Sequence, residues 1–285
     1  MKKILLVGAT GNLGQEVAKA LKKQGYYLVV VVRDESKLKT KNIPYDKCFT
    51  GDMNDYNLYM GAAHGVDIVI STLGKTKQKD KLTPMEVDYN INATLLQAAI
   101  ANGVEQFVYV SVLHGEKLKE LKICAAKERF VDELEKSPIN SLVIRPSGFY
   151  SDMEEFIEMA KIGRVYLLGD GEYKANPIDT KDLAKIMVGT LDMQNTTLEI
   201  GGAQTITHNQ IASLAFEALH KESKVCHIPL SLAKSLLCLL RLFTPQRFYA
   251  PYEFFVHVMS MDMVAKEYGE LTLEEYFKGI IEPKE

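Results

Sequence analysis

The sequence is poor in cysteine, and its few cysteines are not arranged in pairs. Of its 285 residues four are cysteines, and no two of them form a CxxC motif. The four are Cys48, Cys124, Cys226 and Cys238. This scarcity excludes a disulfide-rich scaffold and predicts reduced thiols in a reducing compartment, so we expect a cytoplasmic protein.

Long runs of one kind of side chain are missing too. The 34 lysine and arginine residues are balanced by 37 acidic residues, which gives a net charge of −3 without a long run of either sign. A non-specific nucleic-acid binder would carry a basic cluster, so the charge pattern argues against this class. The longest apolar stretch, around residues 230–243, contains Lys234 and Arg241 and is shorter than the roughly 20 residues of a membrane span.

Motifs for export and for metal binding are also absent. The apolar start at Met1–Val7 runs directly into a glycine turn, so no signal peptide is predicted. The six histidines form neither an HExxH motif nor a cluster with cysteine, and we therefore predict no metal site.

The first half of the chain alternates short β-branched runs with longer helical patterns. Strands are predicted at residues 4–7, 27–32, 47–50, 67–72, 106–110 and 141–144. The clearest helices are predicted at residues 13–24, 84–102 and 118–136. This order is typical of βαβ units and predicts an α/β fold with a Rossmann-type, doubly wound parallel sheet.

The pattern changes after Arg145, where short strands, tight turns and separate helices follow. We predict a Rossmann domain over residues 1–150 and a smaller C-terminal substrate lobe over residues 151–285, packed on the first and partly interwoven with it. A cap helix is predicted around Ser231–Phe243, with polar side chains along one side and leucines over the rest. It would pack on the lobe, or contact an apolar substrate or a membrane surface.

Gly8, Gly11 and Gly14 form a G-x-x-G-x-x-G pattern between the first predicted strand and the first predicted helix. Glycine permits a tight turn and a close approach of backbone amides to a pyrophosphate, while the helix N-terminus adds its positive dipole. Because the strand, turn and helix follow in the required order, the pattern indicates dinucleotide binding.

The end of the second predicted strand bears on the choice between NADP and NAD. Arg33 can stack on adenine and pair with a 2′-phosphate, and Lys37 adds positive charge. An acidic residue at this place would instead hold the ribose hydroxyls of NAD, and Asp34 and Glu35 keep that alternative open. We expect NADP.

Two later segments also lie at predicted strand ends. Asp52 can accept a hydrogen bond from an adenine amino group, or it can serve as the N-cap of the following helix. Leu73 and Gly74 end the segment after the fourth strand, where the chain passes behind the nicotinamide ribose in such folds.

Motifs spread over Met1 to about Ile200 resemble the atypical short-chain dehydrogenase/reductases, and more narrowly the NmrA-like branch near the divinyl chlorophyllide and isoflavone reductases. The motifs that carry the resemblance are GATGNLG, VVRDESKL, TGDMND, EVDYNINATLLQAA, GVEQFVYVS, AKERFVDEL, LVIRPSGFYSDM and NPIDTKDLA.

The resemblance implies a set of site residues. Ser111 takes the place of the family's catalytic serine, and Lys127 that of the lysine that holds the nicotinamide ribose and stabilises charge. The implied cofactor-binding residues are Gly8, Thr10, Gly11, Asn12, Leu13, Gly14, Arg33, Asp52, Met53, Leu73, Gly74, Lys127, Pro146 and Phe149. The resemblance also implies that Phe149 flanks the substrate. Apart from the resemblance, His114 and Tyr150 are further candidate substrate contacts, because an imidazole or a phenol can donate a proton.

One position departs from the family pattern. Ile123 stands four residues before Lys127, where the family has its catalytic tyrosine. A phenol beside an ammonium group can exchange a proton with an alkoxide, which isoleucine cannot do.

Three functions fit what is left of the site. One is an NADP-dependent reductase of a small apolar or conjugated substrate, with a proton from His114 or water. Another is an NADP-sensing regulator of NmrA type that has lost catalysis and binds a protein partner. The last is an assembly or structural protein that keeps a bound nucleotide for stability.

Overall fold

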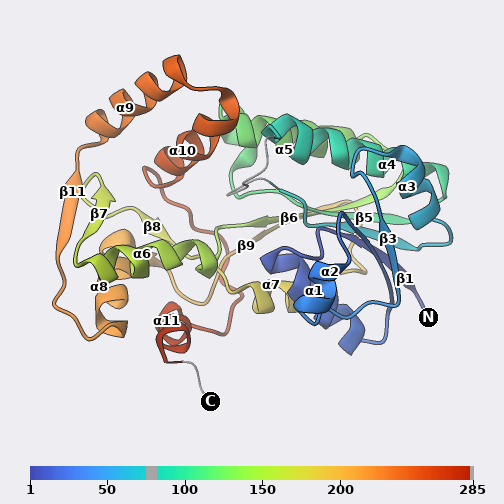
Figure 1. Cartoon of the computed structure of the whole chain (residues 1–285), viewed down its shortest axis with the longest axis horizontal. Helices are drawn as coiled ribbons and strands as arrows, with labels where there is room; N and C mark the ends of the chain where they lie inside the picture. The colour runs from blue at the N-terminus through green and yellow to red at the C-terminus, as the bar shows by residue number, and fades with distance from the viewer. Residues whose placement is uncertain (75–81, 283–285) are drawn as a thin grey trace. The chain divides into compact units, whose positions relative to one another are not determined.

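In the computed structural model, which describes residues 1–74 and 82–282, the chain divides into two units (Figure 1). The first unit comprises Met1–Arg145 and Leu183–Leu198, and the second comprises Pro146–Asp182 and Glu199–Glu285. The chain thus leaves the first unit after β6, returns to it once, and ends in the second. The domain boundary predicted at residue 150 stays a prediction.

A seven-stranded sheet runs in the order β3-β2-β1-β4-β5-β6-β9. All five pairs among the first six of these strands are parallel. The order reverses between β1 and β4, which is the switch point of a doubly wound sheet, so the predicted Rossmann-type fold is confirmed. The strands are β1 (Lys3–Val7), β2 (Tyr27–Val32), β3 (Lys47–Thr50), β4 (Ile68–Ser71), β5 (Gln106–Val110), β6 (Asn140–Pro146) and β9 (Thr196–Ile200).

Helices cover both faces of this sheet. The helical elements are α1 (Asn12–Lys23), α2 (Ser36–Thr40), α3 (Tyr56–Ala62), the π-helical turn η1 (Met85–Asn90), α4 (Ile91–Ala101), the 3₁₀ turn η2 (Gly115–Lys117), α5 (Lys122–Glu135) and α7 (Thr180–Gly189). Buried side chains of α3, α4 and α5 form one cluster with alternate residues of the central strands, such as Leu5 and Val7. Figure 1 shows α1 and α7 on the other side of the sheet. Because successive strand residues point to opposite faces, both faces of β1 are apolar and buried.

Two predicted helices differ in detail from the observed ones. The pattern over residues 84–102 is a π-helical turn that continues into α4 at Ile91. The helix predicted from residue 118 begins only at Lys122, because Leu118 and Leu121 lie in tight turns and Leu121 has an extended backbone. An apolar periodicity that spans a turn and a helix does not mark the boundary between them.

The second unit has its own core. Two short sheets pair β7 (Val165–Leu168) with β11 (Val225–Ile228) and β8 (Lys174–Ala175) with β10 (Ile206–Thr207). The core packs around the buried aromatic side chains of Phe156, Phe216 and Phe277. The helices are α6 (Tyr150–Ile162), α8 (His208–Ala218), α9 (Leu230–Phe243), α10 (Gln246–Val258) and α11 (Leu273–Ile281).

A buried ion pair joins α5 to β6 in the first unit. The two guanidinium nitrogens Nη1 and Nη2 of Arg145 donate to the two carboxylate oxygens of Glu128 at 2.8 and 2.7 Å. Both side chains are less than a tenth exposed. Removing one partner of such a pair leaves an uncompensated charge in the interior.

We expect Arg145→Met to lower the free energy of unfolding by about 3–5 kcal/mol, because it strands the Glu128 carboxylate. Urea denaturation of the purified protein measures this loss. The control is Lys119→Met, since Lys119 pairs with Asp132 at 3.1 Å and both side chains are about half exposed. That substitution should change the stability by less than about 1 kcal/mol. If the free energy of unfolding falls by equally small amounts in the two variants, the Glu128–Arg145 pair is not the stabilising buried pair described here.

Candidate functional site

The turn between β1 and α1 is a backbone structure that only glycine can form. Gly8 has a φ of +95°, and a Cβ on it would lie 2.5 Å from the hydroxyl oxygen of Thr72. A Cβ on Gly14 would overlap the carbonyl oxygen of Gly8 and lie 2.9 Å from the Cα of Ala9. The amide of Gly11 closes the turn by donating to the Gly8 carbonyl at 3.0 Å. Strand, turn and helix are therefore in direct backbone contact.

The N-terminus of α1 is arranged to receive an anion. Its N-cap is Gly11, which supplies no side-chain cap, and the first turn contains no acidic residue. Gly11 and Asn12 are exposed, whereas Leu13 is buried and anchors the helix. The carbonyl of Thr10 points away to accept from Lys41 Nζ at 2.8 Å. The first amides of α1 are thus available to phosphate oxygens, together with the positive end of the helix dipole.

The charged residues after β2 differ in what they are bound to. The carboxylate of Asp34 accepts from the Ser36 amide at 2.9 Å, and hydrogen bonds with Ser36 hold its pKa below the ordinary value. Glu35 accepts from the Tyr45 hydroxyl at 2.6 Å and pairs with Lys39 at 3.2 Å, and these contacts lower its pKa as well. Arg33 is exposed directly at the strand end. Both carboxylates that would favour NAD therefore have local partners already.

Asp52 caps a turn rather than a helix. Its Oδ1 accepts from the amide of Asn54 at 2.9 Å, and the N-cap of α3 is Asp55, which accepts from the Asn57 amide. The N-cap alternative for Asp52 is therefore wrong, because the helix begins three residues later than that reading requires. Asp52 remains exposed, and the neighbouring Met53 is buried. Contact of Asp52 with adenine stays a prediction.

The end of β4 and helix α5 come together at Lys127. Its Nζ lies 3.0 Å from Oδ1 of Asp88, on the π-helical turn η1, and 3.4 Å from the carbonyl oxygen of Val110 at the end of β5. A Cβ on Gly74 would lie 2.8 Å from this Nζ. The structure thus brings together Gly74 and Lys127, two of the predicted cofactor residues, and adds Asp88.

The electrostatic setting keeps Lys127 charged. Burial alone would lower the pKa of its ammonium group, but the charge of Asp88, and to a lesser degree Tyr109 and a hydrogen bond to Asp88, outweigh it. The pKa of Lys127 therefore lies above its ordinary value of 10.5. The Asp88 side chain is fully buried and that of Lys127 is 8% exposed. A permanent cation at this place can stabilise negative charge but is a poor proton donor.

Ser111 belongs to the Glu128–Arg145 pair. Its hydroxyl donates to Oε1 of Glu128 at 2.7 Å, and the residue is 4% exposed. Tyr109, which precedes it on β5, does not replace the missing catalytic tyrosine. Burial raises the pKa of Tyr109, and its hydroxyl donates to the carbonyl of Asp88 at 3.4 Å. Ile123, at the family's tyrosine position, is buried in α5. A catalytic role of Ser111 stays a prediction.

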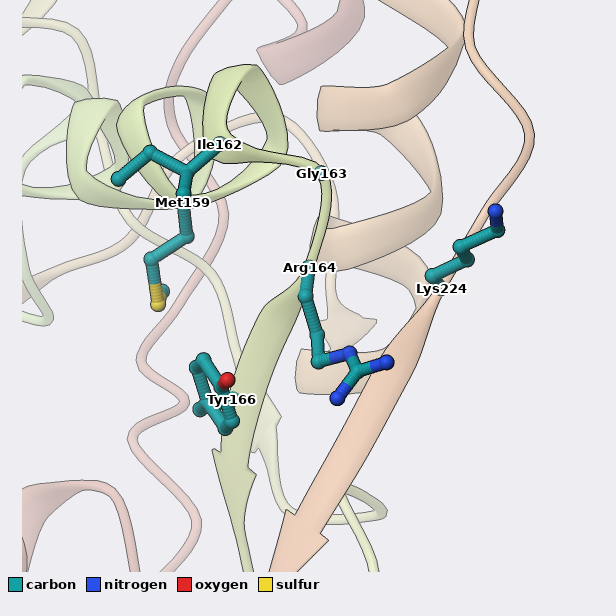
Figure 2. Close-up of a pocket in the computed structure, with 6 residues that line it drawn as sticks. All are labelled: Met159, Ile162, Gly163, Arg164, Tyr166 and Lys224. Carbon is teal, nitrogen blue, oxygen red and sulfur yellow. The ribbon is translucent and has the colours of Figure 1, made fainter.

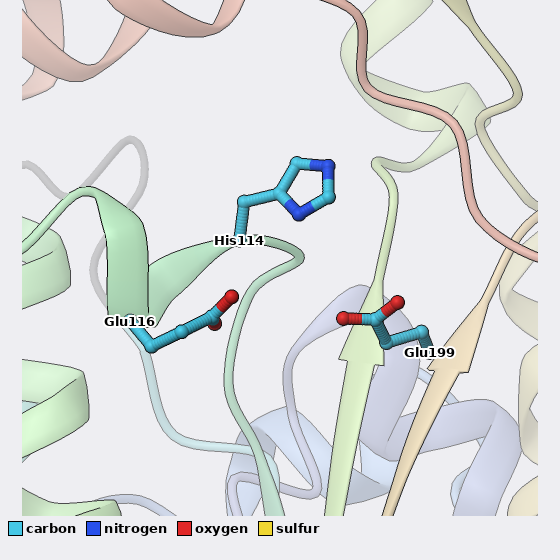
Figure 3. Close-up of side chains that lie close together, drawn as sticks. All are labelled: His114, Glu116 and Glu199. Atoms are coloured by element: carbon cyan, nitrogen blue, oxygen red, sulfur yellow. The ribbon is translucent and has the colours of Figure 1, made fainter.

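His114 occupies a strained position on the segment between β5 and η2. Its φ is +57°, in the left-handed region, and its Nδ1 is buried without a hydrogen-bond partner among the residues that the structure describes. Figure 3 shows its imidazole and the carboxylate of Glu116, which comes from η2 of the same unit. The prediction of no metal site stays a prediction.

The remaining predicted residues lie at the end of β6 or in the second unit. Pro146 ends β6, and Phe149 precedes α6 and bridges to Ile178. The hydroxyl of Tyr150 donates to the carbonyl of Leu271 at 2.8 Å, and burial raises its pKa. Tyr150 therefore has a structural partner inside the second unit. Substrate contact of Phe149 and Tyr150 is not tested by these observations.

A surface cavity lies elsewhere in the second unit. It has a volume of about 400 Å³ and is lined by residues of α6 and β7, by the turn between them, and by Lys224, which precedes β11 (Figure 2). The lining includes Arg164, Tyr166 and Lys224 but none of the predicted site residues.

Sequence reasoning missed Asp88, Glu128 and Arg145. A signal was present for Arg145, because it is a charged residue in a strand that is buried from Ser141 onwards, and a buried charge requires a partner. Which charges pair with one another depends on the packing of α5 against β5, β6 and η1.

The comparisons with known proteins agree with this geometry. A family model described as NAD(P)H-binding matches residues 8–194, from the first glycine of the turn to beyond α7. The chain belongs to the NAD(P)H-binding family. The expected cofactor class is thereby confirmed, and the close-packed glycine turn and the uncapped helix fit a dinucleotide.

Members of this family with known names are similar over most of the chain. A chloroplastic divinyl chlorophyllide a 8-vinyl-reductase from Arabidopsis thaliana is 25% identical over 98% of this chain and 76% of its own length. A photosystem II assembly factor from Trieres chinensis is 26% identical over 81% of this chain and 73% of its own. These likenesses confirm the resemblance to NmrA-like atypical reductases and extend it beyond Ile200.

The solved structures support the same fold. The NADPH-dependent quinone oxidoreductase of Escherichia coli, crystallised with NADPH, superposes with a TM-score of 0.79 over 97% of this chain and 99% of its own. Its sequence identity is 17%, so this likeness concerns the fold.

We expect Gly14→Ala to weaken NADPH binding at least tenfold, because its Cβ would push α1 away from the Gly8 carbonyl. Isothermal titration calorimetry measures the affinity. The control is Gly279→Ala in α11, where a Cβ would meet nothing within 4 Å. That variant should bind NADPH normally and gain up to about 1 kcal/mol of stability. Unchanged affinity in Gly14→Ala would rule out the turn as the phosphate site.

Proposed function

We propose that the protein is an NADPH-dependent reductase that acts on a small apolar, conjugated substrate. The observation that carries this proposal is the buried Lys127–Asp88 pair beside Gly74, in a chain of the NAD(P)H-binding family that has isoleucine in place of the usual tyrosine. A fixed cation without a phenol suits reactions in which negative charge develops on the substrate, and does not suit carbonyl–alcohol exchange through a tyrosine.

The residues have separate tasks in this reaction. The cofactor, when bound, supplies a hydride to one carbon of an activated carbon–carbon double bond. Lys127 orients the nicotinamide ribose and stabilises the enolate or carbanion charge that remains on the substrate. Because its pKa is raised, the proton that completes the reduction comes from His114 or from water. Asp88 holds the ammonium group of Lys127 in place.

Among the known relatives, two have names that support this substrate class. One reduces a vinyl group of divinyl chlorophyllide, and one solved neighbour is a quinone oxidoreductase. Both substrates are conjugated, and addition of hydride to a conjugated system leaves a delocalised anion. This chain has the same fold as the quinone oxidoreductase, and its sequence is 25% identical to that of the divinyl chlorophyllide reductase.

The alternative is a cytoplasmic NADP-sensing protein that binds a protein partner and has no catalytic activity. It is favoured by the hydroxyls of Ser111 and Tyr150, which are engaged with Glu128 and Leu271 respectively. A relative named as a photosystem assembly factor also fits this reading. The four free cysteines agree with a protein of a reducing compartment.

The reductase is tested by following NADPH consumption with a panel of quinones and activated alkenes. With an accepted substrate, Lys127→Met should lower kcat by about 10²–10³-fold. Since that variant strands the buried Asp88 carboxylate, the matched control is the double variant Asp88→Asn with Lys127→Met, which removes both charges. A folded, inactive double variant supports the role of the ammonium group. Full activity in it would contradict the role of the ammonium group, whereas no turnover of any acceptor by the wild type, despite NADPH binding, favours the sensor.

The pH dependence gives a further check. Because the folded pKa of Lys127 is raised above 10.5, the stability from its pair with Asp88 is complete below that value. It is lost only as the pH rises through the higher folded pKa. We expect kcat to show no decline from loss of the Lys127 charge up to about pH 10. A fall of kcat with rising pH below about pH 10 that is absent in Lys127→Arg would contradict this prediction, because it would show that Lys127 loses its charge in that range.

The preference for NADP is tested at Arg33. We expect Arg33→Ala to weaken NADPH binding by about 10–100-fold, the worth of a charged hydrogen bond to phosphate, and to leave NADH binding nearly unchanged. The control is Lys39→Ala, an exposed lysine that pairs with Glu35. An unchanged ratio of the two affinities in Arg33→Ala would remove it from the 2′-phosphate site.

A further inference from the structure

Helices α9 and α10 form a hairpin whose outer side chains are not covered. We call this pair, Leu230–Phe243 and Gln246–Val258, the α9–α10 hairpin. The two helices pack against each other, as Figure 1 also shows. Of the fourteen residues of α9 only Leu237 is buried. A helix of a folded domain normally buries a stripe of apolar side chains, so this helix is unusual.

The uncovered side chains are large and apolar. On α9 the exposed fractions are 60% for Leu232, 59% for Leu236, 52% for Leu239 and 80% for Phe243, and these positions recur at helical spacing. On α10 Phe248, Tyr252 and Phe255 are exposed by about half or more. So many large exposed apolar side chains on two helices that pack together mark an interaction site rather than ordinary solvent contact.

The exposed charges of the hairpin are all positive. Lys234, Arg241 and Arg247 are exposed, whereas the single acidic residue, Glu253, is 2% exposed and pairs with Arg241 at 2.6 Å. The whole chain has a net charge of −3, so the positive hairpin stands out from the rest. Leucine and aromatic side chains bordered by lysine and arginine are typical of helices that lie in a membrane interface.

We propose that the α9–α10 hairpin docks on an anionic membrane surface, with its exposed leucine and phenylalanine side chains among the lipid headgroups and its basic residues on lipid phosphates. The hairpin lies on the surface rather than across the bilayer. Among residues 1–74 and 82–282, none of the helices combines the length and the apolar character that crossing requires.

A bilayer fits these observations better than a second copy of the chain does. In a symmetric dimer the same patch faces itself, which would bring Lys234 and Arg247 of one copy towards those of the other. The hairpin offers no exposed carboxylate to compensate them. An anionic headgroup layer supplies that compensation and accepts apolar side chains beneath it.

The chain has no tryptophan, so an introduced one reports on a single position. We expect the emission of Leu239→Trp to shift to shorter wavelength with vesicles of phosphatidylcholine and phosphatidylglycerol, and to be quenched by lipids with brominated acyl chains. The control is Ile162→Trp on α6, where the native side chain is 89% exposed outside the hairpin. Its emission should not change. Equal responses at the two positions, or none at Leu239→Trp, would overturn the proposal.

Flotation with the same vesicles tests the two parts of the surface. We expect Leu236→Ser with Leu239→Ser, and separately Lys234→Glu with Arg247→Glu, to reduce the bound fraction at least tenfold. Ile162→Ser, and Lys2→Glu with Lys136→Glu, are the matched controls and should float like the wild type. A wild type that does not float but sediments as a dimer, and becomes monomeric on the leucine substitutions, would show that a second copy covers the hairpin instead.

Discussion

The close approach of α1 to the end of β1 is the constraint on which the cofactor site depends. The Gly8 carbonyl occupies the space where a side chain of residue 14 would lie, and Thr72 occupies the space beside Gly8. Because no Cβ can be accommodated, the amides at the start of α1 stand at the switch point of the sheet between β1 and β4. In the proposed cofactor site a dinucleotide phosphate at that point would neutralise the helix N-terminus, which has no acidic residue in its first turn. The segment after β4 lies against this turn, since a Cβ on Gly8 would meet the backbone of Thr72 and Leu73.

Two buried charge pairs stand at the ends of β5 and β6, and they have different chemical consequences. The Glu128–Arg145 pair satisfies both carboxylate oxygens and both guanidinium nitrogens in a fork, and it takes the Ser111 hydroxyl as a further donor. Arg145 also pairs with Glu116 at 3.2 Å and donates to the Val112 carbonyl at 3.1 Å, so the pair belongs to a larger network. In the Lys127–Asp88 pair the ammonium group contacts Asp88 at 3.0 Å and the Val110 carbonyl at 3.4 Å, and it lies beside Gly74. Helix α5 thus supplies the anion of one pair, Glu128, and the cation of the other, Lys127.

The loss of the tyrosine changes what this lysine can do. In the family that the sequence resembles, the lysine acts partly through the phenol of the catalytic tyrosine. In this chain Ile123 stands at the position of that tyrosine, and its side chain is buried in α5. Tyr109 and Tyr150 are both bound to backbone carbonyls, and burial raises the pKa of each. The role that we propose for Lys127 is therefore electrostatic stabilisation by a buried cation, which suits reduction of a polarised double bond better than oxidation of an alcohol.

The sequence by itself determined the Rossmann-type sheet, the glycine turn and the cofactor class. These depend on local signals, because strand periodicity, a G-x-x-G-x-x-G spacing and a charged strand end are read within a few residues of one another. The strands at Tyr27–Val32, Lys47–Thr50 and Gln106–Val110 were predicted at their observed bounds.

Only the tertiary structure decided that Asp88 pairs with Lys127, that the Ser111 hydroxyl donates to Glu128, and that Asp55 rather than Asp52 caps α3. It also decided which side of α9 stays uncovered. Partners such as Asp88 and Lys127 lie on separate elements of the chain, and their pairing follows from how helices pack on the sheet, which no local pattern encodes.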